Sequence, residues 1–337
     1  LNDNTQRGIY ISSDFNKIKK NNFNNSLLST TYDFELTSNA DFNEISGNNF
    51  LGNGGLDAGT NNFYCAEKNT FGPSAKKPLG AFLCRECKDD DKDKTYAINA
   101  TCPLGNDCDD SNASIIGVLD DMLINGSIAV CPGSYTVEDK NNNGIFIMNA
   151  NDASLDCNGA TINSSRAYYG YGLYASNKQR VSFKNCNIED YRYGAYLYNA
   201  VNSTLKDLNF DKNSYGAYLS SGNSNTLKNL EVTNTQNYGI YLYYSSRNVL
   251  DKTVTNNNYY GIYDYYGGFN IIENATIKAN SRYGMLLYGN NNTVEESIIK
   301  DNQQRGIYVN SDFNTIRKNN FDNANFSSTY DLDLTTS

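Results

Sequence analysis

Ionisable side chains are the first candidates for chemistry, but their spacing gives no cluster that could react. The chain of 337 residues contains no histidine, so the usual acid or base of neutral-pH catalysis is missing. The acidic residues of the regular part of the chain stand singly, which is typical of a solvated surface. We therefore predict no catalytic residues and expect a protein that is not an enzyme. The residues concerned are Asp207, Asp211, Asp251, Asp264 and Glu273.

A denser group of carboxylates lies in an irregular segment and could bind a cation. Clustered carboxylates suit Ca²⁺, and Asp89, Asp91 and Asp109 are its candidate ligands. We favour the alternative interpretation, a solvated loop beside a disulfide knot, and therefore expect no cofactor. The full cluster is Asp89, Asp90, Asp91, Asp93, Asp107, Asp109 and Asp110.

Eight cysteines in a chain without histidine indicate an oxidising, extracytoplasmic setting. The spacings Cys84-X2-Cys87 and Cys102-X5-Cys108 could hold a structural Zn²⁺, although the second is wide for that purpose. We favour disulfides, whose pairing in this segment stays open. A further bridge is predicted between two adjacent coils of the regular part. The segment contains Cys65, Cys84, Cys87, Cys102, Cys108 and Cys131, and the further bridge joins Cys157 and Cys186.

Tyrosine, present 28 times, recurs at fixed positions and should form a broad aromatic face with hydroxyl rims. Such a face can stack on sugars or pack against another subunit. The alternative is that outward tyrosines simply suit strand propensity. Among the functional interpretations we favour self-association. The face should contain Tyr174, Tyr196, Tyr198, Tyr218, Tyr241, Tyr243, Tyr263, Tyr265 and Tyr288.

A glycine repeat defines the elements that must position these side chains. The period of 22 or 23 residues fits one coil of a parallel β-solenoid, because helical repeats are typically longer, about 33 residues or more. The residue after each glycine is apolar and should face the core, whereas the next residue should face outward. The anchors are Gly172, Gly194, Gly216, Gly239, Gly261, Gly284 and Gly306.

Asparagine repeats with the same period, just before the second strand of each coil. Stacked amides at a tight turn can hydrogen-bond one another and the backbone from coil to coil. The alternative is a polar ligand site. The expected ladder is Asn225, Asn248, Asn270, Asn292 and Asn314.

Loss of the period divides the chain into three parts. Residues 1–64 should be the last coils of a preceding solenoid, 65–130 a cysteine-rich linker or cap, and 131–337 a solenoid body. Within the linker, residues 111–125 are predicted to form a short amphipathic helix that covers the open end of the body. Its apolar face would consist of Ile115, Val118, Leu119 and Met122.

Three phrases add a family resemblance. Val130-Cys-Pro-Gly-Ser-Tyr135, Leu155-Asp-Cys-Asn-Gly-Ala-Thr-Ile162 and Phe183-Lys-Asn-Cys-Asn-Ile188, followed by the glycine-anchored coils, resemble the right-handed parallel β-helix repeat family. This family includes pectate-lyase-like proteins and, closest in character, large archaeal cell-surface proteins. The resemblance implies an all-β, right-handed parallel β-helix, to which the sequence adds a disulfide-rich, partly helical module. The clustered aspartates with histidine, or the grouped Ca²⁺ ligands, of the family's enzymes are not found here.

The two ends of the chain repeat each other. Residues 1–39 align without a gap on residues 299–337, an offset of 298, and 23 of the 39 positions are identical. We interpret this as a second, higher-order repeat of about 298 residues.

We therefore predict a non-catalytic structural or adhesive protein of the cell surface, a repeat unit of a tandem solenoid filament or stalk. The alternative is a carbohydrate-binding or polysaccharide-degrading β-helix protein. Its partners would be further copies, head to tail or as covalent repeats, and cell-surface glycans. A net charge of −9 disfavours nucleic acid, and no apolar run approaches the roughly 20 residues of a membrane span.

Sequons suggest glycosylation, although chance gives about as many in so asparagine-rich a chain. The predicted acceptors are Asn99, Asn112, Asn125, Asn163, Asn202, Asn274 and Asn291.

Overall fold

The structure is a computed structural model, and it describes residues 115–322 and 330–335 together with short stretches of the first 82 residues. It divides into two compact units, Leu1–Ala113 and Ser114–Ser337. The described stretches of the first unit are 7–12, 17–19, 22–23, 32–36, 44–46, 49–50, 55–57, 63–65, 70–71 and 81–82.

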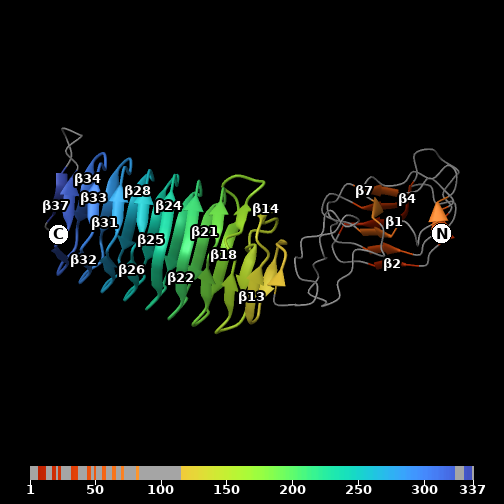
Figure 1. Ribbon diagram of the computed structural model, residues 1–337, viewed down its shortest axis with the longest axis horizontal. Coiled ribbons are helices and arrows are strands. Elements are labelled where there is room, and N and C mark those ends of the chain that lie inside the picture. The colour runs from red at the N-terminus through yellow and green to blue at the C-terminus, as the bar shows by residue number, and fades with distance from the viewer. Residues whose placement is uncertain are drawn as a thin grey trace. The chain divides into compact units, whose positions relative to one another are not determined.

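The second unit is a parallel β-helix whose coils stack one after another up to β37 (Figure 1). One side is a ten-stranded sheet, here called the tyrosine sheet. Each of its strands pairs in parallel with the equivalent strand of the next coil. Its strands are β12 (Met122–Ile124), β15 (Phe146–Met148), β18 (Tyr171–Ser176), β21 (Tyr193–Tyr198), β23 (Tyr215–Ser220), β25 (Tyr238–Tyr243), β28 (Tyr260–Tyr265), β31 (Tyr283–Leu287), β34 (Arg305–Val309) and β37 (Tyr330–Leu334).

The remaining strands of this unit form a 17-stranded sheet, here called the second sheet. Most coils contribute two short strands to it, and in two coils these fuse into one strand of eight residues. Its strands are β11 (Ile115–Ile116), β13 (Ser127–Val130), β14 (Ser134–Thr136), β16 (Ser154–Asp156), β17 (Thr161–Asn163), β19 (Ser182–Lys184), β20 (Asn187–Glu189), β22 (Thr204–Asp211), β24 (Thr226–Thr233), β26 (Val249–Asp251), β27 (Val254–Asn256), β29 (Ile271–Glu273), β30 (Thr276–Lys278), β32 (Thr293–Glu295), β33 (Ile298–Lys300), β35 (Thr315–Arg317) and β36 (Asn320–Asp322).

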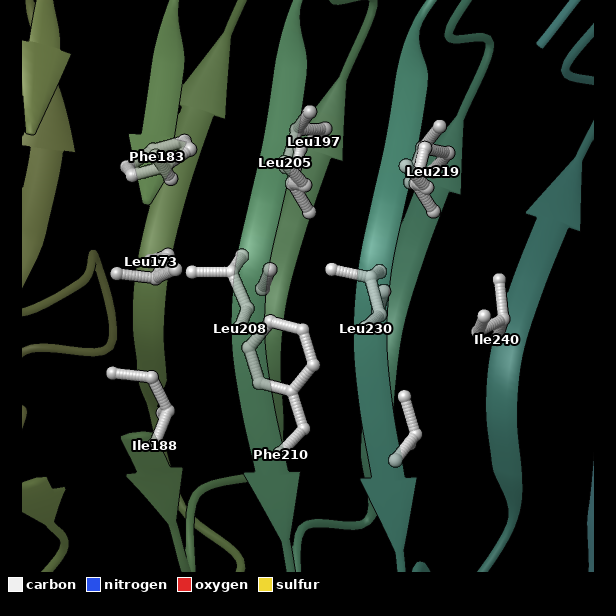
Figure 2. Close-up of a cluster of buried hydrophobic side chains, with 14 of the residues drawn as sticks. Leu173, Phe183, Ile188, Leu197, Leu205, Leu208, Phe210, Leu219, Leu230 and Ile240 are labelled. Atoms are coloured by element: carbon white, nitrogen blue, oxygen red, sulfur yellow. The ribbon is translucent and has the colours of Figure 1, made fainter. Parts of the chain in front are cut away.

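Strand register confirms the predicted solenoid. Ala195 pairs with Ala217, and Ala217 with Ile240, so the residue after each glycine stacks on its equivalent in the next coil. These side chains are fully buried between the two sheets. Figure 2 shows Leu173 and Ile240 among leucines and phenylalanines of neighbouring strands. Burial of these apolar columns is the main force that holds the coils together.

The glycine that anchors each coil is needed for close packing of backbones. A Cβ atom on Gly194 would lie 2.7 Å from the carbonyl oxygen of Gly216, and one on Gly239 would lie 2.6 Å from that of Gly261. Both separations are shorter than real Cβ contacts. The Tyr-Gly phrase therefore marks a place where adjacent coils approach too closely for a side chain.

Asparagine side chains line the inside of the solenoid turns. The backbone N–H of Asn248 donates to Asn270 Oδ1 at 2.9 Å, and that of Asn270 donates to Asn292 Oδ1 at 2.9 Å. The same contacts join Asn225 to Asn248 and Asn292 to Asn314. A second buried ladder, not predicted, joins Asn258, Asn280 and Asn302 through backbone N–H donors at 3.1 Å.

The helix predicted over residues 111–125 is wrong for the part that the structure describes, from Ile115 onward. Strands β11 and β12 occupy this stretch, with a turn at Asp120 and Asp121 between them. β11 pairs with β13 and β12 with β15, so the solenoid begins near Ile115 rather than at residue 131. Strand pairing provides hydrogen-bond partners for the backbone N–H and C=O groups and buries Ile124. This gain outweighs the helical preference that the local spacing of apolar residues indicates.

The described stretches of the first unit also form parallel strands, arranged in three sheets. Its parallel pairing continues to Phe82, beyond the limit expected at residue 64. The pairs Arg7 with Tyr32 and Arg305 with Tyr330 show that the two repeated segments share one register. The strands are β1 (Arg7–Ile11), β4 (Tyr32–Leu36) and β7 (Gly55–Asp57); β2 (Lys17–Lys19), β5 (Glu44–Ser46), β8 (Phe63–Cys65) and β10 (Ala81–Phe82); and β3 (Asn22–Phe23), β6 (Asn49–Phe50) and β9 (Thr70–Phe71).

Candidate functional site

The tyrosine sheet brings the predicted tyrosine face together. Two tyrosine columns run along it, one just before each glycine and one two residues after it. Their members are mostly half-buried, whereas Tyr198, four residues after its glycine, is exposed. The first column is Tyr171, Tyr193, Tyr215, Tyr238, Tyr260 and Tyr283, and the second is Tyr174, Tyr196, Tyr218, Tyr241, Tyr263 and Tyr308. Tyr243, Tyr265 and Tyr288 lie beside them.

Rings of the second column stack on one another along the solenoid. Tyr218 lies between Tyr196, at 5.1 Å and 29°, and Tyr241, at 4.8 Å and 14°. Tyr241 in turn stacks on Tyr263 at 5.0 Å and 8°. Because both faces of these rings are covered, the ladder offers ring edges and hydroxyl groups to a ligand rather than open ring faces.

The hydroxyl groups of Tyr193, Tyr218 and Tyr241 stay protonated at neutral pH. Burial raises the pKa of Tyr193 to about 12, because removal from water penalises the phenolate. The pKa values of Tyr218 and Tyr241 are also raised, mainly by burial and to a smaller extent by the neighbouring tyrosines. The sheet therefore presents a row of neutral groups that both donate and accept hydrogen bonds.

Besides Arg192, which lies over the Tyr193 ring, two arginines interrupt this neutral row, Arg282 just before β31 and Arg305 in β34. The Arg282 guanidinium lies 5.5 to 5.8 Å from the ring centroids of Tyr259, Tyr260 and Tyr283, and its Nη1 donates to the Tyr260 hydroxyl at 2.8 Å. Arg305 forms an ion pair with Asp333. In residues 115–322 and 330–335, by contrast, no carboxylate forms an ion pair with Arg282.

Neither arginine was singled out in the sequence, although a signal existed. Arg282 follows Tyr259 by 23 residues and Tyr260 by 22 residues. Because one coil has 22 or 23 residues, the period places Arg282 beside these two tyrosines of the preceding coil. Five donors in a rigid fork make guanidinium a receptor for carboxylate or sulfate groups. Three aromatic rings and one hydroxyl fix its position, so little side-chain freedom remains to be lost on binding.

Two acidic residues expected at the surface are buried, and one of them is inside the core. Asp264 is 0% exposed, so the prediction of a solvated side chain is wrong. The outward side chains of its strand are Tyr263 and Tyr265, and strand alternation turns the residue between them inward. Asp251 is also buried, whereas Asp207, Asp211 and Glu273 are partly exposed.

The predicted bridge between Cys157 and Cys186 is present, with the two Cα atoms 4.9 Å apart. Cys131 is also disulfide-bonded. Cys84, Cys87, Cys102 and Cys108, the side chain of Cys65 and the Ca²⁺ candidates Asp89, Asp91 and Asp109 lie outside the described residues. Elsewhere in the described part, no group of three or more acidic or cysteine side chains is arranged to hold a metal ion.

The sequons differ in accessibility. Asn125, Asn202, Asn274 and Asn291 are exposed and Asn163 is half-buried, while Asn99 and Asn112 lie outside the described residues. Their glycosylation stays a prediction. Among the described residues, no helix is long and apolar enough to cross a membrane.

Comparison with known proteins gives one family and several similar folds. The description "right handed beta helix region" matches residues 133–277 and 199–331. No curated protein matches the chain. Solved structures of similar fold include the A-module of a mannuronan C-5 epimerase from Azotobacter vinelandii, at 16% identity, a TM-score of 0.47 and 64% of each chain covered. The chain thus spans less than two thirds of that module.

Two further structures share the fold. A pectate lyase is 17% identical with a TM-score of 0.46, covering 65% of this chain and 70% of the lyase. The tailspike protein of an E. coli bacteriophage, in complex with a pentasaccharide, is 9% identical with a TM-score of 0.48, covering 66% of this chain and 49% of the tailspike. At such identities the likeness establishes the fold alone.

These comparisons correct the prediction of a non-catalytic structural or adhesive filament. The proteins named above are an epimerase, a lyase and a saccharide-bound tailspike. The prediction that the chain is not an enzyme is corrected with it. The prediction rested on the absence of a cluster of acidic residues, and such an absence carries no conclusion about activity.

Proposed function

This chain belongs to the right-handed β-helix family, and on that premise we propose that it binds an acidic polysaccharide along the tyrosine sheet. In the tyrosine sheet, the strand of each coil lies about 4.8 Å from the strand of the next coil. This spacing is comparable with the length of one sugar unit in an extended polysaccharide. The hydroxyl row supplies donors and acceptors at each step. A polysaccharide lying along the solenoid would thus meet the same set of groups at successive sugars.

Arg282 is the observation that carries the acidic part of the proposal. In a chain of net charge −9, Arg282 is a cation held in place by aromatic rings and a hydroxyl group, and no carboxylate of the described residues forms an ion pair with it. It would bind a carboxylate or sulfate of the glycan in a charge-assisted hydrogen bond, which contributes about 1.5–3 kcal/mol. A neutral glycan would lack this contact and bind more weakly.

Degradation of the bound chain is a second candidate function, favoured by the contact between Arg282 and Tyr260. Burial raises the pKa of Tyr260, so its hydroxyl is a neutral proton donor at the position where the guanidinium would hold an acidic sugar. A donor placed there could protonate the oxygen of a breaking glycosidic bond. The disulfide between Cys157 and Cys186 supports an extracytoplasmic site of action.

Calorimetric titration with alginate and polygalacturonate, against neutral dextran, tests the proposal. We expect the acidic chains to bind, dextran to bind weakly or not at all, and Arg282→Gln to lower the affinity about tenfold. Arg317→Gln is the matched control, because Arg317 lies in the second sheet and is paired with Glu295. Equal affinity of wild type and Arg282→Gln, or no binding of either acidic chain, would contradict the proposal. Shortening of the titrated chains would show degradation.

A further inference from the structure

The turns after β25 and β28 carry large aromatic side chains where neighbouring coils have small polar ones. Each turn contains two residues with positive φ, three positions apart. At the first of these positions, Asn199 and Ser221 are followed by Tyr244 and Tyr266 in the next two coils. The second position is occupied by Asn202 and Ser224 in the two coils before, by Arg247 and Phe269 in these two turns, and by Asn291 in the coil after.

These aromatic side chains occupy strained backbone. The φ angles of Tyr244, Tyr266 and Phe269 are 48°, 51° and 57°, in the left-handed region, where a bulky residue costs about 1–2 kcal/mol and asparagine much less. Burial does not offset this cost, since the three residues are 49%, 56% and 55% exposed. The same strain occurs singly at Tyr168 and Phe313, but in these two turns it occurs at tyrosine rings that lie side by side, which points to a function for the side chains.

The two turn tyrosines are rotated out of the tyrosine ladder. The ring of Tyr244 is perpendicular to that of Tyr243, with 4.6 Å between centroids, and the ring of Tyr266 makes 69° with that of Tyr265. Tyr244 and Tyr266 lie 5.7 Å apart at only 28°. Their rings therefore form a pair that adjoins the tyrosine sheet but exposes ring surface that the ladder covers.

Small residues stand on either side of this pair along the solenoid, and one cation belongs to the same turns. The equivalents of Tyr244 and Tyr266 in the coils on either side are Ser221 and Gly289, neither of which has a bulky side chain. The Arg247 guanidinium lies over the Phe269 ring at 5.5 Å, three residues beyond Tyr244 and Tyr266 in the same two turns. We name Tyr244, Tyr266, Arg247 and Phe269 the turn platform.

We propose that the turn platform is a stacking subsite for one pyranose unit of the acidic polysaccharide. This inference rests on the proposed function and adds the place where a sugar ring stacks. The C–H face of a pyranose packs against open aromatic surface, which the ladder does not offer and the turn pair does. Arg247 supplies donors for the hydroxyl or carboxylate groups at the rim of that sugar.

The test uses the double variant Tyr244→Asn, Tyr266→Asn in the whole chain. Asparagine occupies the equivalent positions 177 and 199 with φ of 54° and 49°, so the variant should fold and have a Tm equal to or above that of wild type. We expect its affinity for polygalacturonate to fall about tenfold. Tyr168→Asn is the control, because Tyr168 is exposed with φ of 60° in another loop and should relieve strain without loss of affinity.

The outcomes separate this inference from the proposed function. Wild-type affinity in the double variant, with Arg282→Gln still weakened, would overturn the turn platform and leave the proposed function standing. A Tm below that of wild type would also overturn it, because the aromatic residues would then be structural. Absence of polygalacturonate binding by wild type would overturn both.

Discussion

Asp264 takes a core position that other coils give to leucine. It pairs with Leu242 in the coil before and with Leu287 in the coil after. Its Oδ1 accepts from the Gly267 backbone N–H at 3.1 Å and its Oδ2 from Asn292 Nδ2 at 2.7 Å. Burial raises the pKa of Asp264 to about 6, because the loss of hydration outweighs these hydrogen bonds.

The raised pKa makes stability depend on pH in a defined direction. Between about pH 4 and pH 6 the folded chain holds a proton on Asp264 that the unfolded chain has released, so stability falls as pH rises. The free energy of unfolding should fall by roughly 3 kcal/mol over this range. The Asp264→Asn variant should not show this fall, and it should be more stable than wild type above about pH 6. Chemical denaturation across this range measures it. The control Asp207→Asn, at the surface, should keep the fall, and identical pH profiles for wild type and Asp264→Asn would contradict the prediction.

At the residue scale, the period of the sequence predicts the surroundings of some side chains but not the backbone strain of others. Asp264 falls in the column of Leu197, Leu219 and Leu287, so its burial could be predicted from the period. The bridge between Cys157 and Cys186 was predicted because stacked coils bring such residues close. The strain at Tyr244 could not be predicted, since positive φ at a tyrosine contradicts ordinary backbone preference.

Buried asparagine ladders tie adjacent coils together at the turns. Asn270 Oδ1 accepts from the backbone N–H of Asn248 at 2.9 Å and from Asn248 Nδ2 at 3.1 Å, while Asn270 Nδ2 donates to the Ser245 carbonyl at 2.9 Å. All three contacts are buried. An apolar substitution would leave these donors and the acceptor without partners.

Asn270→Ala should therefore lower the free energy of unfolding by roughly 3 kcal/mol or more, since each unpaired buried group costs about 1–3 kcal/mol. Denaturant unfolding measures the loss. Asn320→Ala, at an exposed site of β36, should stay within about 0.5 kcal/mol of wild type. A loss at Asn270 as small as that at Asn320 would show that the ladder does not stabilise the solenoid.

At the scale of elements, periodicity was a good guide where one column dominates. The glycine and asparagine columns predicted the coils and their register because identical residues stack in a parallel solenoid. The prediction of a helix at 111–125 was wrong because β11 and β12 pair with later strands. A local helical pattern gives no information about such pairing. The second asparagine ladder has the same period and could have been found.

Charge is distributed differently over the two sheets of the second unit. On the second sheet, lysines and arginines pair with carboxylates, as in Lys228 with Asp251 and Arg317 with Glu295. On the tyrosine sheet, Arg305 is likewise paired with Asp333, whereas Arg282 contacts aromatic rings and a hydroxyl group. Exposed ion pairs contribute little to stability, so the functional contrast lies in the cation that remains available to an anionic ligand.

A crystal structure of the chain with a bound oligogalacturonate tests the central claim most directly, because it shows where the glycan lies. The account predicts a chain along the tyrosine sheet, with one carboxylate on the Arg282 guanidinium and hydroxyl groups beside the tyrosine ladder. An oligosaccharide on the second sheet, or one on the tyrosine sheet that leaves Arg282 without a contact, would contradict it.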